Sequence, residues 1–211
     1  MSSQVTSAAS TSVWAGGQRP YAVNSKKFGM WLFLISDSLT FSAMLFAYTY
    51  SRVTNPDWPK PFDFSPAIIF STIMTFCLLS SSLTMVMAVH AMNHGDRKAC
   101  VKWILGTMAG GGAFVVLHMS EWLKLINVEH VTPASNPWGV PLFGGTFFGL
   151  TGLHMTHVIC GIIYLFVILV GISRGKFKAE DVEVSGLYWH FVDLVWMFIF
   201  PLVYLMSARV G

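Results

Sequence analysis

The chain has 211 residues, of which 54% are hydrophobic and only 11% are charged, a composition that excludes an ordinary soluble domain and predicts an integral membrane protein. Its formal net charge of +3 comes from scattered residues without Lys/Arg runs, which excludes a basic nucleic-acid-binding surface. The three cysteines show no CxxC spacing, so they predict neither a disulfide framework nor a thiolate metal site.

The first segment is rich in Ser, Thr, Ala and Gly, which predicts a flexible tail over residues 1–25. A single membrane domain is predicted for residues 26–211. A bilayer core needs about 20 apolar residues per helix, and five runs reach this length. The expected spans are residues 28–50, 66–92, 103–122, 144–172 and 187–206. The fold class is therefore all-α, an integral membrane bundle of five transmembrane helices.

Local signals add detail to these spans. Ser65 and Pro66 predict the N-cap and the first turn of the second span. The glycines within residues 109–112 predict a close approach between helices. Residues 175–186 carry several charges and predict a loop, and Pro201 predicts a kink late in the last span.

Lysine and arginine are distributed unevenly between the two ends of the predicted spans. Nine of them lie in the N-terminal segment and in the second and fourth loops, and four lie at the opposite ends. Short loops that are rich in Lys and Arg stay in the cytoplasm. The sequence therefore predicts a cytoplasmic N-terminus and a C-terminus on the outside.

Asp37 is the only residue with a full charge at neutral pH between Lys27 and Arg52. It lies ten residues beyond Lys27. At about 1.5 Å per residue, this places it about 15 Å deep, near the middle of the bilayer. A carboxylate at that depth is costly and must face protein. We therefore expect a partner for Asp37 on another helix.

Four further polar residues in the last two spans have helical spacing. His154 and His157, and likewise His190 and Asp193, are separated by three residues and so share a helix face. This spacing predicts a hydrogen-bonded pair between His190 and Asp193. It also predicts that His157 or His154 meets Asp37 across the bundle.

The buried polar residues allow three interpretations. Haem or copper ligation by His154 and His157 is disfavoured, because two histidines three residues apart on one helix cannot bracket a porphyrin. A proton relay could run from the inner end through Asp37 to the outer end of the third span, but no energy-coupling motif accompanies it. The residues alone favour helix pairing together with the holding of lipid head groups, with Arg97 near anionic phospholipid.

Several runs, taken in chain order, resemble subunit III of the haem-copper respiratory oxidases. They are the KFGM run from Lys27 with the Ser36-Asp37 pair, GDRK from Gly95, SEW from Ser120, TGLHMTHV from Thr151 and YWHFVDLVW from Tyr188. The resemblance spans residues 26–206. It implies a bundle that packs directly on the catalytic subunit I of an oxidase, in a complex with subunit II and small subunits.

The resemblance also implies a function and a location. Haem and copper are expected on the partner subunits and no cofactor on this chain. The chain itself is expected to stabilise the catalytic subunit, to support proton uptake and to bind structural phospholipids, in the bacterial inner (cytoplasmic) membrane. A respiratory supercomplex is a further assembly that the resemblance allows.

The site residues follow from the same motifs. Asp37 corresponds to the family's buried functional carboxylate, which is known for its reactivity with carbodiimides. Six further residues match polar motif positions, for which the resemblance implies a structural or lipid-binding role: Arg97, Glu121, His154, His157, His190 and Asp193. Catalytic, metal-binding and cofactor-binding residues are not expected on this chain.

Departures from the family pattern leave the electron donor open. Asp37 stands where cytochrome c oxidase members often have Glu, and His118 stands where many relatives have Gln. The chain lacks the first two helices of the seven-helix mitochondrial form and so resembles the short bacterial form. The GDRK run favours a cytochrome c oxidase. A quinol oxidase subunit III, and an independent transporter or proton relay, are the alternatives.

Overall fold

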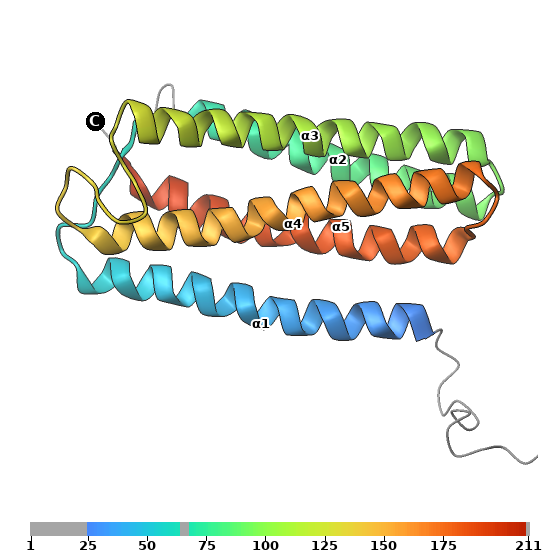
Figure 1. Ribbon diagram of the computed structural model, residues 1–211, viewed down its shortest axis with the longest axis horizontal. Coiled ribbons are helices and arrows are strands. Elements are labelled where there is room, and N and C mark those ends of the chain that lie inside the picture. The colour runs from blue at the N-terminus through green and yellow to red at the C-terminus, as the bar shows by residue number, and fades with distance from the viewer. Residues whose placement is uncertain (1–24, 64–67, 210–211) are drawn as a thin grey trace, which may run out of the picture.

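The computed structural model describes residues 25–63 and 68–209, and five long helices make up most of this part (Figure 1). Each of the five is long and apolar enough to span a membrane, which confirms the predicted all-α membrane bundle. The helices are α1 (Ser25–Thr54), α2 (Ile69–Asn93), α3 (Arg97–Asn127), α4 (Pro141–Ser173) and α5 (Ala179–Ile199). The predicted tail, apart from its last residue, and the predicted cap at Ser65 and Pro66 lie outside the described residues.

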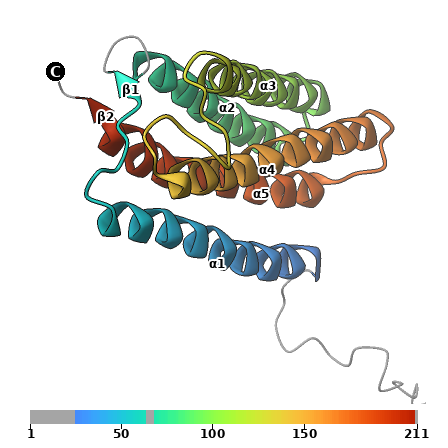
Figure 2. The ribbon, with the colours of Figure 1, turned by 60° about the vertical axis from the view of Figure 1, so that its left-hand side comes forward.

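The helices divide into a packed group and a peripheral helix. In both views α1 lies along one side of the bundle, next to α4 and α5, while α2 and α3 lie on the far side (Figures 1 and 2). The buried residues of α1 form a narrow seam with an almost heptad spacing: Leu34, Phe41, Tyr48 and Ser51. Only 11% of the most apolar window of α1 is buried, against 44% for the last span. Most of the surface of α1 is therefore open to lipid or to another protein.

The packed group is held together by aromatic rings and by close helix contacts. Trp189 and Trp196 on α5 are almost completely buried. A Cβ atom on Gly111 of α3 would lie only 2.4 Å from the ring of Trp189. A Cβ atom on Gly110 would lie 2.7 Å from the Cβ of Ser81 on α2. The close approach predicted from residues 109–112 is thus confirmed, since these glycines bring α3 close to both α2 and α5.

The helices are longer than their apolar runs, and one predicted loop was wrong. Residues 175–186 were expected as a loop, but α5 begins at Ala179. Its first turn contains Glu180 and Asp181, which suit the positive end of the helix dipole. The Asp181 carboxylate also accepts a hydrogen bond of 2.9 Å from the backbone N–H of Lys178. Polar capping therefore starts this helix two turns before its apolar part.

Residues 200–209 close the end of the bundle at which α1 ends. At Pro201 the helix changes to the π-helical turn η3 (Phe200–Tyr204) and the short η4 (Leu205–Ser207), in agreement with the predicted late irregularity. Arg52 of α1 donates hydrogen bonds to the carbonyls of Leu202 and Met206. The two-residue strands β1 (Phe62–Asp63) and β2 (Ala208–Arg209) then pair in parallel. These contacts tie the C-terminal end of α1 and the segment after it to residues 202–209.

Candidate functional site

Asp37 meets His157 across the contact between α1 and α4. Its Oδ2 atom lies 3.3 Å from His157 Nε2, and both side chains are largely buried. This confirms the predicted partnership of Asp37 with one of the two histidines of α4. The contact has the length of an ion pair but not the geometry of a hydrogen bond, so Oδ2 has no hydrogen-bond donor among the described residues. Phe41, one turn further along α1, packs edge-on against the His157 ring.

His154 turns toward the other side of α4 and does not serve Asp37. Its side chain is fully buried, and its Nε2 donates a hydrogen bond of 3.1 Å to the backbone carbonyl of Val192 on α5. Its ring packs on Trp196, with 5.0 Å between the ring centroids. The three-residue spacing gives the two histidines different partners, so one pairs α4 with α1 and the other pairs α4 with α5.

The predicted pair between His190 and Asp193 was wrong. His190 Nδ1 lies 2.6 Å from the hydroxyl of Ser82 on α2. Ser82 also interacts with the Asp193 carboxylate, whose Oδ1 has no hydrogen-bond partner. The two side chains share a face of α5, as expected, but His190 bonds to a serine of the neighbouring helix. Helical spacing could not identify this serine, since it lies 108 residues away from His190.

Glu121 forms the best satisfied of the buried polar contacts. Ser71 of α2 donates to its Oε1 at 2.9 Å, and Tyr204 of η3 donates to its Oε2 at 2.8 Å. All three side chains are buried. His118, one turn earlier on α3, packs among the rings of Phe114, Trp122 and Trp196. Glu121 therefore joins α3 to two other parts of the chain.

Arg97 lies apart from these contacts, in the first turn of α3 at the opposite end of the bundle. Its side chain is exposed, and together with Lys98 and Ile172 it lines a hollow of about 370 Å³. The structure therefore does not bring Arg97 together with the other motif residues. Two cationic side chains beside an apolar helix end are the arrangement expected at a membrane surface that binds anionic head groups.

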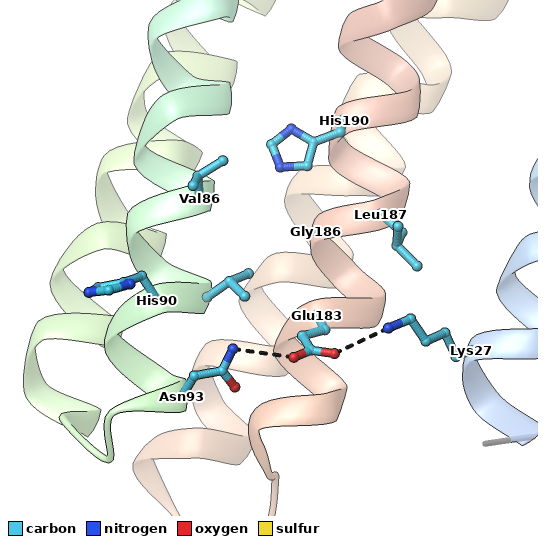
Figure 3. A pocket seen from close by; sticks show the side chains of 9 residues that line it. Lys27, Val86, His90, Asn93, Glu183, Gly186, Leu187 and His190 are labelled. Atoms are coloured by element: carbon cyan, nitrogen blue, oxygen red, sulfur yellow. Dashed lines mark hydrogen bonds and ion pairs between the residues drawn. The ribbon is translucent and has the colours of Figure 1, made fainter. Parts of the chain in front are cut away.

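An amphipathic groove was not predicted from the sequence. Its polar end holds Glu183 of α5, which interacts with Lys27 of α1 at 3.4 Å and with Asn93 of α2 at 3.3 Å (Figure 3). Its volume is about 470 Å³, and His190 lines it further along α5. His190 also lines a second hollow of about 470 Å³ between α1 and α5, which is almost entirely apolar. A charged end followed by an apolar trough suits an amphiphilic ligand.

Sequence comparisons assign the family. The sequence model described as "Cytochrome c oxidase subunit III" matches residues 6–208. A "Cytochrome c oxidase subunit 3" of Alkalihalophilus pseudofirmus is 34% identical over 87% of this chain and 88% of the relative. The chain belongs to the cytochrome c oxidase subunit III family.

Other members of the family differ in name and in length. A "Quinol oxidase subunit 3" of Bacillus spizizenii is also 34% identical, over 85% of this chain and 86% of the relative. A "Cytochrome c oxidase subunit 3" of Hippopotamus amphibius is 30% identical over 92% of this chain but over only 74% of the relative. The chain is thus similar to subunits III of both oxidase types, which agrees with the resemblance noted in its motifs.

The motif residues of this subunit III can be compared with what a metal or haem would need. Within residues 25–63 and 68–209, no three His, Cys, Asp or Glu side chains come together in a way that could hold a metal ion. His154 and His157, the pair considered for haem, use one ring nitrogen each on a backbone carbonyl, those of Val192 and Leu153. Five of the motif residues are engaged in contacts between and within the helices, namely Asp37, Glu121, His154, His157 and His190.

Proposed function

We propose that this chain is the non-catalytic subunit III of a proton-pumping haem-copper terminal oxidase and that it packs directly on subunit I. The proposal is supported by four motif side chains that contact other helices. Asp37 reaches α4, Glu121 reaches α2 and η3, and His154 reaches α5. His190 of α5 reaches α2. Such contacts specify how helices pair in a membrane and require no reacting group.

The surroundings of the chain form part of the proposal. We place it in the bacterial inner membrane with its N-terminus in the cytoplasm, because most of its Lys and Arg residues lie at that end. Haem and copper belong to the partner subunits. Subunit II, the small subunits and a respiratory supercomplex are further partners. The role of the chain is to stabilise subunit I and to support proton uptake into it.

The electron donor is proposed to be cytochrome c, since the family and the relative from Alkalihalophilus pseudofirmus carry that name. A quinol oxidase is the second candidate, because the relative from Bacillus spizizenii is equally identical. The donor binds to other subunits, so the subunit composition of the purified complex distinguishes a cytochrome c oxidase from a quinol oxidase.

Phospholipid binding is proposed at the end of the bundle where α1 begins. The groove beside Glu183 offers both a cation and a carboxylate, and Arg97 and Lys98 offer two cations at the hollow near Ile172. We expect Arg97→Ala to reduce the amount of bound anionic lipid in native mass spectrometry of the purified complex. Lys60→Ala, on the opposite side of the membrane in the proposed orientation, is the control. An unchanged lipid count in Arg97→Ala would remove this assignment.

The main proposal is tested by purifying the tagged chain from its native membranes in mild detergent. The reduced-minus-oxidised haem spectrum and the copurifying polypeptides are recorded together. We expect haem absorbance and a large polytopic catalytic subunit. A subunit that carries a cytochrome c site or a quinol site then identifies the donor. A colourless chain that purifies alone would contradict the oxidase proposal and favour an independent transporter or proton relay.

A further inference from the structure

Two exposed histidines lie one turn apart where α2 ends. His90 is in the last turn of the helix and His94 is the residue that caps it, so the two side chains lie on the same face. The centroids of their rings are 4.2 Å apart, and the ring planes are tilted by 38°. Within residues 25–63 and 68–209 this is the one ring contact between two histidines. A pair of imidazoles at this spacing is a candidate for joint binding of a metal ion.

The His94 ring is held in the orientation that a metal ligand needs. Its Nδ1 lies 2.9 Å from the backbone carbonyl oxygen of His90. A carbonyl oxygen only accepts hydrogen bonds, so Nδ1 carries the hydrogen, and Nε2 of the neutral ring keeps its lone pair. Metal-binding histidines donate their second ring nitrogen to a carbonyl in the same way, which fixes the tautomer and the ring. The Nε2 atom of His94 is therefore prepared to bind a cation.

The His90 ring can supply the second ligand. It is exposed and makes no hydrogen bond among the described residues, so either of its nitrogens is available. Two imidazole nitrogens that bind one Zn²⁺ ion at about 2.0–2.1 Å must lie about 3.0–3.4 Å apart. Rings whose centroids are 4.2 Å apart can reach this separation by a small rotation of the exposed His90 side chain.

The charges around the pair favour a cation. The pair lies at the C-terminal end of α2, where the helix dipole is negative. Asp96, two residues beyond His94, adds a carboxylate, of which Oδ1 accepts the backbone N–H of Ala99. The next residue, Arg97, lines a different hollow together with Ile172. The local field therefore does not oppose a bound metal ion.

We propose that His90 and His94 form a binding site for a divalent transition-metal ion such as Zn²⁺, which clasps the last turn of α2. Imidazole suits Zn²⁺, Cu²⁺ and Ni²⁺, whereas Mg²⁺ and Ca²⁺ prefer oxygen ligands. Two protein ligands are fewer than the three or four of a resident Zn²⁺ centre. Water therefore completes the coordination, and the ion exchanges with the solution on its side of the membrane.

This site is separate from the groove beside Glu183. Although His90 borders that groove, its ring points away from Glu183 and Lys27 (Figure 3). A lipid in the groove and a metal ion on the histidines would thus occupy different places. The inference rests on the end of α2 alone and stands apart from the oxidase proposal.

A bound ion links the last helical turn to the residue that caps it. In this turn the backbone N–H groups of His94 and Gly95 donate to the carbonyls of His90 and Met92, at 3.2 and 3.1 Å. A ligand that binds the folded turn but not the opened turn stabilises the folded one. Hydrogen exchange of these amides should therefore become slower when the ion binds.

The first test is calorimetric titration of Zn²⁺ into the purified protein, within whatever complex it forms. Other subunits can also bind Zn²⁺, so the measured quantity is the difference between the wild type and each variant. We expect His94→Ala, and likewise His90→Ala, to weaken one binding event at least about tenfold, since the loss of outer-shell partners alone costs about 10–100-fold in metal affinity. An excess of Mg²⁺ should not compete.

His130→Ala is the matched control for this titration. His130 is also exposed, but it lies alone in the loop between α3 and α4 and makes no ring contact among the described residues. Its removal should leave the titration unchanged. Identical titrations of the wild type and both α2 variants, or an equal loss in His130→Ala, would overturn the proposal.

Hydrogen–deuterium exchange followed by mass spectrometry gives an independent readout. Peptides that contain residues 90–96 should exchange more slowly with Zn²⁺ than without it in the wild type. The ion should have no effect on these peptides in His94→Ala, and Mg²⁺ should have none in either protein. Unchanged exchange in the wild type, or slowing that persists in His94→Ala, would show that the ion does not clasp this turn and would overturn the proposal.

Discussion

Asp37 and Glu121 are two buried carboxyl groups that the chain holds in different ways. Glu121 accepts hydrogen bonds from Ser71 and Tyr204, one on each oxygen, inside the packed group of α2 to α5. Asp37 faces a single imidazole at 3.3 Å on the margin of that group. Two hydroxyls can satisfy a carboxyl group without altering its charge, whereas an imidazole can also share a proton with it.

The same contrast separates the two parts of the bundle. α3 and α5 meet through glycine and tryptophan in direct contact, while α1 touches its neighbours along one seam. Substitutions in the packed group should therefore cost more stability than equivalent substitutions on α1. Four variants test this difference, and three of them have a matched control variant.

The largest loss is expected for Glu121→Leu. It leaves the hydroxyl of Tyr204 buried without its acceptor, at a cost of about 1–3 kcal/mol, and it removes the carboxyl oxygen to which Ser71 donates. Thermal unfolding of the purified complex, followed by tryptophan fluorescence, measures the effect. Glu121→Gln keeps one acceptor oxygen and should lose clearly less. Equal midpoints for Glu121→Leu and the wild type would mean that this contact does not stabilise the packed group.

Gly111→Ala should cost about 1–3 kcal/mol, because its Cβ would overlap the buried ring of Trp189 at 2.4 Å. Gly29→Ala on α1 is the matched control, since its Cβ would have no atom within 4 Å. The same unfolding assay compares the two variants. If both lose the same stability, the proposed difference between the packed group and α1 is incorrect.

Tyr48→Phe removes a buried hydroxyl from the seam of α1. This hydroxyl lies 3.1 Å from the Ser207 hydroxyl, so we expect a loss of about 1 kcal/mol. Proteolysis in the segment after α1 should become faster, because the variant weakens the link between α1 and the end of the chain. Tyr50→Phe, two residues away on the exposed face, should behave like the wild type. A larger loss of stability and faster proteolysis in Tyr50→Phe than in Tyr48→Phe would contradict the assignment of the seam.

The smallest effect is expected for Lys26→Ala. Lys26 forms an ion pair with Asp181 at 2.6 Å, but its side chain is 61% exposed. Such pairs contribute about 0–1 kcal/mol and are screened by salt. Any loss of stability should therefore disappear at high ionic strength. A larger loss that persists in salt would mean that this end of α1 is held more firmly than its exposure indicates.

The sequence predicted the features that depend on long apolar runs and on depth. It predicted five spans, a partner on α4 for Asp37 and irregularity at Pro201, and the structure agrees with each. The start of α5 was misplaced, because the first two turns of that helix are polar. Only the hydrogen bond by which Asp181 caps the helix indicates its start there.

Contacts that join distant parts of the chain could not be read from spacing. His190 bonds to Ser82 and not to Asp193, the partner that its helix position suggested, and Tyr204 reaches Glu121 across 83 residues. The groove at Lys27 and Glu183 likewise needs three helices to be brought together. Helical spacing predicts which residues share a face, but the facing helix decides which of them are bonded.

The most direct test of the account uses Asp37→Asn in the whole complex. In the proposed function the buried polar groups of this chain pair helices and take no part in oxygen reduction, and asparagine at position 37 keeps a side chain of nearly the same shape that can donate an N–H to the His157 ring. The complex should therefore assemble with an unchanged haem spectrum and an unchanged rate of oxygen reduction per haem. Loss of the haem absorbance, or a complex that assembles but no longer reduces oxygen, would contradict the account.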